Sequence, residues 1–158
     1  MLRTGRLSSQ TVNLLDTLQN KLPDFYLAGD TALAMYYEHR VSFDLDFFSA
    51  ESYRPEVLLE YLKQFGVSVE NVRLQTGTLE AEIEGVRTSF FEYHYALVEP
   101  LDKYRSLDVA SVIDIAAMKL SAIAARAEKK DYFDLAEILK REPSKKVLEA
   151  FVKKYGRE

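Results

Sequence analysis

Cysteine and tryptophan are both absent from the 158 residues of this chain. Without cysteine, the chain can form no disulfide, use no thiolate nucleophile and offer no thiolate ligand to zinc or an iron–sulfur centre. No apolar stretch approaches the roughly 18 residues that a membrane-spanning helix needs. The N-terminal segment has basic residues but neither a long apolar run nor a small-residue cleavage site, so it does not read as a signal peptide. We therefore expect a cytoplasmic protein with no membrane partner.

The composition is that of a globular chain with an uneven distribution of charge. Hydrophobic residues make up 47% of the sequence, and 21 basic against 25 acidic residues give a net charge of −4. Seven basic and three acidic residues from Lys140 to Glu158 give that segment a charge of +4 and leave −8 for residues 1–139. An acidic body argues against binding to duplex DNA by bulk charge. The basic end suits an RNA partner or a solvated helix.

The hydrophobic periodicity predicts alternating helices and strands, followed by a β-rich region and then by helices. Apolar residues spaced by three and four positions indicate helices, and alternation indicates strands. The expected helices are residues 8–22, 31–38 with Asp30 as N-cap, 55–65, 111–127, 131–140 and 144–155. The expected strands are residues 25–28, 42–48, 67–74, 79–83 and 86–98. This order predicts an α+β fold in which an α/β core, residues 1–105, carries a helical region, residues 106–158, in one compact unit.

The segment Asp44-Leu45-Asp46 is the most informative motif. Residues i and i+2 of a strand point to the same face, so both carboxylates project together. Two such anions about 4 Å apart repel by roughly 4 kcal/mol at an effective dielectric constant of 20. A shared divalent cation relieves that repulsion, and Mg²⁺ takes one or two carboxylates together with substrate phosphates. The alternative is a solvent-facing strand that happens to carry two aspartates.

The turn upstream of this motif suits a phosphate group. A buried strand, residues 25–28, leads into Gly29-Asp30-Thr31 and directly into a helix, whose first N–H groups and dipole favour an anion. Between the turn and the carboxylates lie His39, Arg40 and Ser42. A phosphate cradle, a cation and two metal-binding acids form a layout suited to a nucleoside triphosphate.

These segments resemble the nucleotidyltransferase-fold AbiEii/AbiGii toxin family. Residues 29–33 (GDTAL) and 39–48 (HRVSFDLDFF) resemble its G-G-T-A-L-like turn and its H-R-x-S-x-D-L-D-F-F motif. Residues 114–120 (DIAAMKL), Arg126 and residues 130–135 (KDYFDL) resemble a second, downstream motif. The resemblance implies a DNA-polymerase-β-like nucleotidyltransferase core, with a mixed sheet, flanking helices and C-terminal helices. It also implies Mg²⁺-dependent transfer of a nucleoside monophosphate from an NTP.

The resemblance also assigns roles and partners. Characterised relatives are toxins of toxin–antitoxin pairs and some add nucleotides to tRNA ends, so we expect a tRNA or protein hydroxyl as acceptor and a cognate antitoxin. Asp44 and Asp46 would hold the metal. The catalytic residues that follow are Asp44, Asp46, Lys119 and Asp131. The nucleotide-binding residues that follow from the turn, the loop and the downstream helix are Gly29, Thr31, Arg40, Ser42 and Arg126.

The charged residues of the downstream motif permit two interpretations. Lys119 and Arg126 lie two turns apart on one helical face, where both could reach triphosphate oxygens. Asp131 and Asp134 share a face at the start of the next helix. The alternative is that these cations pair with these acids and fasten the two helices. Arg40 likewise could bind phosphate or pair with Asp44 or Asp30.

Two departures from the family pattern favour a second function, a catalytically weak binding or interaction module of the same fold. The second glycine of the turn is Asp30 here, a carboxylate that would repel a triphosphate. The strand expected to supply a third carboxylate as general base has no acid at its start, and Glu92 is its one candidate. The acids Glu80, Glu82 and Glu84 alternate with apolar residues and indicate a solvated strand face.

The aromatic residues and histidines near this strand could either pack in the structure or contact a ligand. Phe91, Tyr93 and Tyr95 share one strand face and could stack on nucleobases, although packing within the sheet is the commoner use of such a stripe. His39 could order the loop before the aspartates, and His94 is expected to pack rather than to bind a metal.

Overall fold

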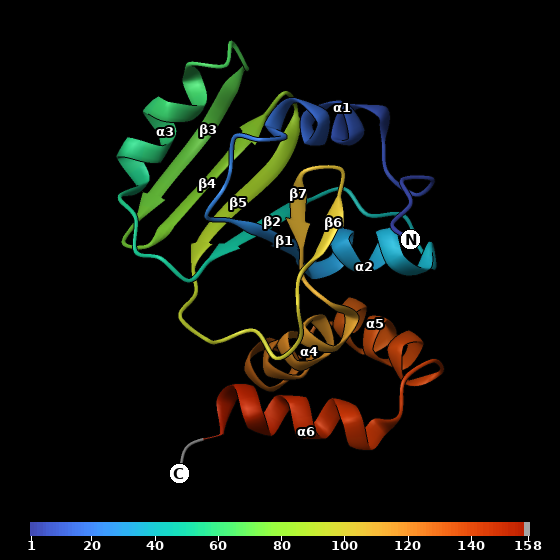
Figure 1. The fold of residues 1–158 in the computed structure, drawn as a ribbon. Coiled ribbons are helices and arrows are strands. Elements are labelled where there is room, and N and C mark those ends of the chain that lie inside the picture. The colour runs from blue at the N-terminus through green and yellow to red at the C-terminus, as the bar shows by residue number, and fades with distance from the viewer. Residues whose placement is uncertain (157–158) are drawn as a thin grey trace.

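The computed structural model describes residues 1–156; Arg157 and Glu158, which end the basic segment, lie outside the described residues. Seven strands form one mixed sheet in the order β3-β4-β5-β2-β1-β7-β6 (Figure 1). The strands are β1 Tyr26–Ala28, β2 Leu45–Ser49, β3 Val69–Gln75, β4 Thr78–Ile83, β5 Val86–Glu92, β6 Asp102–Tyr104 and β7 Leu107–Val109. The helices are α1 Ser9–Leu18, α2 Gly29–Tyr37, α3 Pro55–Lys63, α4 Val112–Arg126, α5 Lys129–Leu139 and α6 Ser144–Tyr155.

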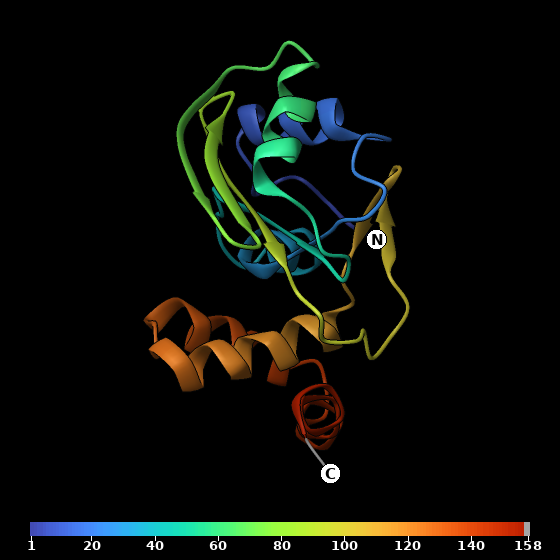
Figure 2. The ribbon, with the colours of Figure 1, turned by 90° about the vertical axis from the view of Figure 1, so that its left-hand side faces the viewer.

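The two central strands set the architecture of the sheet. β2 runs antiparallel to β1 and parallel to β5, while β1 runs parallel to β7. The helices α1 and α3 pack on one side against β5 and against β3 and β4, whereas α2 and α4 lie at the opposite side (Figures 1 and 2). The α+β fold with a mixed sheet, flanking helices and C-terminal helices is therefore confirmed.

Alternation along β2 divides its side chains between the core and the opposite face of the sheet. Leu45, Phe47 and Ser49 are buried, whereas Asp46 and Phe48 are half-buried. Phe47 stacks on Phe90 of β5, with ring centroids 5.2 Å apart, at the centre of the core. Because a strand has a period of two, this strong burial of one face fixes the direction of Asp46.

The C-terminal helices pack on one another and on the core through α4. Ser111 caps α4 by accepting a hydrogen bond from the Asp114 N–H. Lys154 of α6 is buried and donates to Asp114 at 2.9 Å, so an ion pair fastens α6 to α4. Lys154 therefore is not available to an RNA, and its place in the predicted basic surface was wrong. Other basic side chains of α6, Lys145 and Lys153, are exposed.

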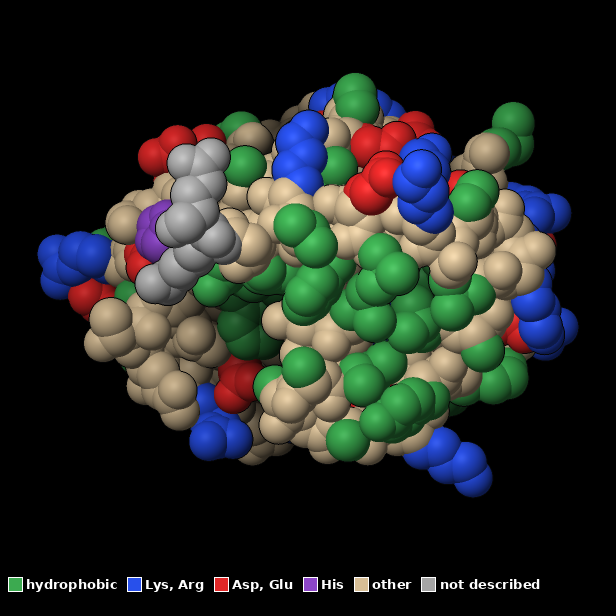
Figure 3. All heavy atoms as spheres, turned by 90° about the horizontal axis from the view of Figure 1, so that it is seen from below, with side chains coloured by type: hydrophobic (Ala, Val, Ile, Leu, Met, Phe, Trp, Pro, Cys, Tyr) green, Lys and Arg blue, Asp and Glu red, His purple; other side chains and the backbone are tan. Residues whose placement is uncertain are grey.

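The outer face of α6 leaves apolar side chains in solvent. Leu148 and Val152 are 56% and 64% exposed and line a shallow hollow with Lys145 and Lys153. Seen from below, where α6 lies, the molecule presents a broad group of apolar side chains between scattered charges (Figure 3).

Several predicted boundaries were wrong. The strand expected from Ser42 begins at Leu45, because Ser42 and the Asp44 carbonyl bind Thr31 instead of a neighbouring strand. The strand expected over 86–98 ends at Glu92, after which the chain leaves the sheet. The hairpin of β6 and β7 was missed. Asp30 is not an N-cap but the second residue of α2, which begins at Gly29.

Candidate functional site

The two aspartates of the D-x-D motif open into a cleft of about 620 Å³ between the sheet and α4. Asp44 lies immediately before β2 and Asp46 lies within it, and both line the cleft. Gly29 and Asp30, the first residues of α2, line the same cleft because Ala28 of β1 pairs with Asp46. The antiparallel pair β1–β2 thus brings the predicted phosphate turn beside the predicted metal ligands.

Gly29 is required at this turn by its conformation and by its closeness to Asp46. Its φ is +75°, and a Cβ atom added to it would lie 2.9 Å from Asp46 Oδ2. A side chain at this position would therefore be strained and would collide with the carboxylate. The absence of a Cβ keeps the N-terminus of α2 open to a ligand at Asp46.

The environment of Asp46 disfavours its charged form. Burial, together with the charges of Asp30 and Asp44, raises the pKa of Asp46 to about 6. The neighbouring cations Lys119, Arg40 and Lys130 pair with Asp30 rather than with either aspartate of the motif. A cation bound at Asp44 and Asp46 would relieve this repulsion, so the donor set fits a divalent metal.

Lys119 lies at the centre of a carboxylate cluster. Its side chain is only 4% exposed, and Nζ lies 2.9 Å from Asp131 and 2.8 Å from Asp134, and also contacts Asp30. Although burial opposes charge on a lysine, Asp30 and Asp134 raise the pKa of Lys119 above its ordinary value. The lysine is therefore a buried ammonium that joins α2, α4 and α5.

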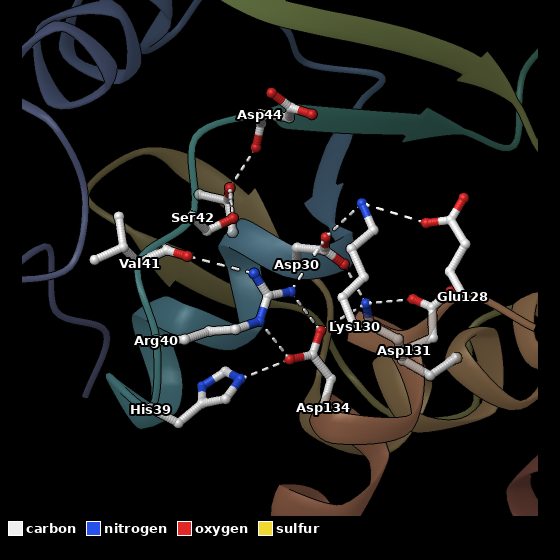
Figure 4. Close-up of polar contacts among 12 residues, drawn as sticks. Asp30, His39, Arg40, Val41, Ser42, Asp44, Glu128, Lys130, Asp131 and Asp134 are labelled. Carbon is white, nitrogen blue, oxygen red and sulfur yellow. Dashed lines mark hydrogen bonds and ion pairs between the residues drawn. The ribbon is translucent and has the colours of Figure 1, made fainter.

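Asp134 anchors the loop that precedes the D-x-D motif. Arg40 donates two parallel hydrogen bonds to its carboxylate, from Nε at 2.8 Å and from a terminal nitrogen at 2.7 Å (Figure 4). His39 Nε2 lies 2.7 Å from the same carboxylate. Although burial opposes it, these contacts and Lys119 hold the pKa of Asp134 well below its usual range. Arg40 also pairs with Asp30 at 3.2 Å, so the salt-bridge alternative holds with Asp30.

Three acids of this cluster are spaced as metal ligands could be, but the ammonium group of Lys119 lies between them. Oxygen atoms of Asp30, Asp131 and Asp134 lie within 4.8 Å of one another. Lys119 contacts all three. A cationic nitrogen thus already supplies the charge that a metal ion would bring. The same contacts, with Lys130 at 3.0 Å, explain how Asp30 is tolerated at the turn: burial would raise its pKa, yet the lysines lower it.

The hydroxyl groups of Thr31 and Ser42 face each other and not the cleft. Their oxygens lie 2.7 Å apart, both residues are buried, and the Thr31 hydroxyl also donates to the Asp44 carbonyl. These contacts fix the backbone of Asp44 against α2. Nucleotide binding by Thr31 and Ser42 stays a prediction, and so do the assigned roles of the other site residues.

Two partly exposed cations, Arg126 and Lys130, also line the cleft. Arg126 and Lys130 have side chains 50% and 44% exposed, and each is paired with an acid, Asp131 at 3.1 Å and Asp30 at 3.0 Å. Lys130 was not among the predicted site residues, although it begins the KDYFDL motif that carried the resemblance. Its position beside Asp30 comes from the packing of both α2 and α5 against α4, which the sequence alone did not reveal.

The strands beside β2 carry no acid directly opposite Asp46. Ser89 of β5 is its partner in register, and Glu80 of β4 is in turn the partner of Ser89. Glu80 lines the cleft, whereas it was expected on a solvated face. Glu92 also lines the cleft, where it accepts from the Tyr53 N–H at 3.3 Å and contacts His94 at 3.2 Å. These contacts lower the pKa of Glu92.

Solved structures share this fold. JHP933 from Helicobacter pylori is similar with a TM-score of 0.64 and 18% identity, over 94% of this chain and 80% of its own. The Megavirus polyadenylate synthase is similar with a TM-score of 0.52 and 14% identity, over 94% of this chain and 31% of its own. At these identities the likeness shows the fold alone. The predicted DNA-polymerase-β-like nucleotidyltransferase core is therefore confirmed.

Sequence comparisons match the C-terminal half of the chain to a family model. The model described as "Nucleotidyl transferase AbiEii toxin, Type IV TA system" matches residues 82–158. The uncharacterized protein aq_aa25 of Aquifex aeolicus (strain VF5) is 39% identical over 142 residues, covering 83% of this chain. The chain spans 66% of that relative's length. The predicted resemblance to the AbiEii nucleotidyl transferase toxin family is thus confirmed. Across residues 1–156, none of the helices has the length and apolar character needed to cross a membrane.

Proposed function

We propose that this chain is a Mg²⁺-dependent nucleotidyltransferase that moves a nucleoside monophosphate from an NTP to a hydroxyl group of an RNA, such as tRNA, or of a protein. The observation that carries the proposal is the pairing of Asp44 and Asp46 in the cleft beside the open N-terminus of α2. A divalent cation held by these carboxylates would supply Lewis-acid stabilisation of charge at the α-phosphate. The class of reaction is then an in-line displacement of pyrophosphate by the acceptor hydroxyl.

The remaining residues of the cleft bind and orient the substrate in this proposal. The first N–H groups of α2 would donate to a phosphate group at Gly29. The dipole of the helix favours an anion there, and glycine has no side chain to block it. Arg126 and Lys130 have the exposure needed to reach the β- and γ-phosphates. Lys119 is a positioning residue, because its contacts hold Asp30 and Asp131 in place and leave it almost no exposed surface.

Label transfer tests the proposed reaction directly. Wild-type protein would be incubated with Mg²⁺, each α-labelled NTP and either total tRNA or a protein extract. We expect label on one acceptor class and none with Asp46→Asn or Asp44→Asn. Asp24→Asn is the matched control, because Asp24 is exposed and lies outside the cleft. Equal transfer by wild type and Asp46→Asn would contradict the proposal.

We also propose a toxin role with a cognate antitoxin, which the match of residues 82–158 to the AbiEii toxin model supports. Expression of wild type would then slow growth of a host cell, whereas Asp44→Asn would not, because the mutant lacks one metal ligand. Co-expression of the antitoxin would restore growth. Equal growth of wild type and mutant would remove the toxin role and leave the nucleotidyltransferase activity to be judged by label transfer.

A binding module without turnover is the second candidate, favoured by the full engagement of Lys119 and by Asp30 at the turn. It requires nucleotide binding without transfer. Calorimetry with each NTP and Mg²⁺ beside the label-transfer assay separates the two functions: heat of binding with no transferred label supports the module.

A further inference from the structure

The floor of the cleft changes from charged to aromatic along its strands. Asp44, Asp46 and Phe48 follow one another at every second position of the same segment, and all three line the cleft. β5 runs parallel beside β2, so Ser89 lies opposite Asp46 and Phe91 lies opposite Phe48. The parallel register therefore gives the two neighbouring strands polar side chains at one end, Asp46 and Ser89, and aromatic rings at the other, Phe48 and Phe91.

The opposite wall, α4, changes in the same direction. Arg126 at the C-terminal end of α4 lies at the charged end, where it pairs with Asp131. Ile115, near the N-terminal end of α4, and Met118, at its middle, also line the cleft. They lie at the aromatic end, because Asp114 lies near Tyr26, the residue that stacks on Phe48. Both walls thus present charge at one end and apolar surface at the other.

The aromatic rings line the cleft and contact one another across neighbouring strands. Phe48, Phe91 and Tyr93 are half-buried, with the Phe48 ring 5.2 Å from that of Phe91 and 5.3 Å from that of Tyr93. Beside them, on the same face of the sheet, the ring of Tyr26 stacks on Phe48 with centroids 5.9 Å apart. These contacts hold the rings rigid, so a flat ligand that stacks on them would cost little side-chain entropy.

The polar groups at this end already have partners in the protein. The Tyr93 and Tyr155 hydroxyls hydrogen-bond each other, and Ser121 is a further partner of Tyr155. Glu92 is engaged by Tyr53 and His94. A ligand placed here would meet apolar and aromatic surface with few free donors or acceptors.

We propose that this aromatic end, formed by Phe48, Phe91, Tyr93 and Met118, holds the nucleobase of the bound NTP by stacking and discriminates only weakly between the four bases. The proposal rests on the proposed function, which places the triphosphate at the charged end. A base has a π-face whichever base it is, and stacking discriminates little between bases, whereas strong selection needs unpaired donors and acceptors. All four NTPs should bind within about tenfold of one another.

Binding of NTPs and of a baseless probe separates the two ends of the cleft. The ligands are the four α,β-methylene NTPs and inorganic tripolyphosphate, measured by calorimetry with Mg²⁺. Phe91→Leu and Phe48→Leu remove a ring but keep apolar bulk, and Tyr132→Leu is the control because this aromatic residue is 52% exposed and lies outside the cleft. We expect each Phe→Leu variant to weaken NTP binding about tenfold and to leave tripolyphosphate binding unchanged. Tyr132→Leu should change neither.

The results that would contradict the proposed nucleobase site can be distinguished from one another. NTPs and tripolyphosphate bound equally well by wild type would remove the base site and keep the phosphate site. Unchanged NTP binding in both Phe→Leu variants would do the same. One NTP bound more than about 100-fold tighter than the rest would contradict the proposed low selectivity for the base. Binding of neither ligand by wild type would remove the proposed function itself together with the base site.

Discussion

Asp46 is a single residue of the candidate site whose negative charge lowers the stability of the folded protein. Its carboxylate is placed near Asp30 and Asp44, in a partly buried position, and its pKa is raised to about 6. In the unfolded chain an aspartate has a pKa near 3.8. The folded protein therefore binds the proton more tightly, and charging Asp46 lowers the free energy of unfolding as the pH rises from about 4 through about 6.

Asp46→Asn should stabilise the metal-free protein in a pH-dependent way. At pH 7.5 the amide removes the buried charge, so we expect the free energy of unfolding to rise by about 1–3 kcal/mol. At pH 4 the wild-type carboxyl is protonated and the difference should nearly vanish. Urea unfolding in EDTA at both pH values measures the change, with Asp24→Asn as the exposed control. A mutant less stable than wild type at pH 7.5 would contradict this account of Asp46.

Addition of Mg²⁺ should reverse the order of stability. Because the ion binds the ionised carboxylate, Mg²⁺ should raise the melting temperature of wild type at pH 7.5, less so at pH 5, and not at all in Asp46→Asn. The protons compete with the metal below the pKa of about 6. A rise that is the same at both pH values would indicate that the metal binds elsewhere.

Lys119 is the second residue for which the structure predicts whether a substitution raises or lowers the free energy of unfolding. Its removal in Lys119→Met leaves Asp30, Asp131 and Asp134 close together without their shared cation. We expect a loss of about 3–5 kcal/mol in the free energy of unfolding. Lys130→Met is the control, because Lys130 contacts Asp30 from a position 44% exposed and should cost less than about 1 kcal/mol. Similar losses in the two variants would contradict the central role of Lys119.

At the scale of elements, α6 is attached to the core by one buried ion pair. Lys154 reaches Asp114 of α4 and the Ala96 carbonyl, each at 2.9 Å, and both charged side chains are fully buried. Lys154→Met should cost about 3–5 kcal/mol, because it leaves a buried carboxylate without its cation. Lys153→Met, one position earlier and exposed, should change stability by less than about 0.5 kcal/mol. Urea unfolding followed by circular dichroism measures both.

The elements that could be predicted from the sequence are those whose signals are local. The bounds of α6 were predicted without error and those of α4 to within a residue at each end, because Ser111 and the apolar spacing mark α4. The strands β6 and β7 were missed because each has only three residues, carries charged side chains and shows no clear alternation. Their stability comes from pairing with each other and with β1.

In the candidate site, too, the features with local sequence signals could be predicted, and those that depend on contacts between distant segments could not. The position of Asp46 on a strand beside the turn at Gly29 follows from the alternation of its neighbours and from the short connection between the elements. The partners of Lys119 could not be predicted in full, because Asp30 is 89 residues away in the sequence. The pair of Lys154 and Asp114, 40 residues apart, was missed for the same reason. Packing between distant elements decided both.

At the scale of the whole molecule, the cleft belongs to both parts of the predicted division at residues 105 and 106. The sheet supplies the aspartates, and α4 supplies the facing wall. Ile113, Ile115 and Ala116 of α4 join the same hydrophobic core as Leu27 of β1. The division into a core and a helical region therefore describes the order of the chain, and we expect the two regions to fold as one unit.

Equilibrium unfolding tests this single unit. Far-UV circular dichroism reports chiefly on the helices, while near-UV circular dichroism reports on packed tyrosines such as Tyr26 and Tyr93 in and beside the sheet. Because the shared core and the contacts of Lys119 join both regions, the two urea curves should superimpose on one transition. Lys154→Met should move both curves to lower urea together. A helical transition that precedes loss of the near-UV signal would show that residues 106–158 unfold separately, and that the cleft can lose its α4 wall while the sheet stays folded.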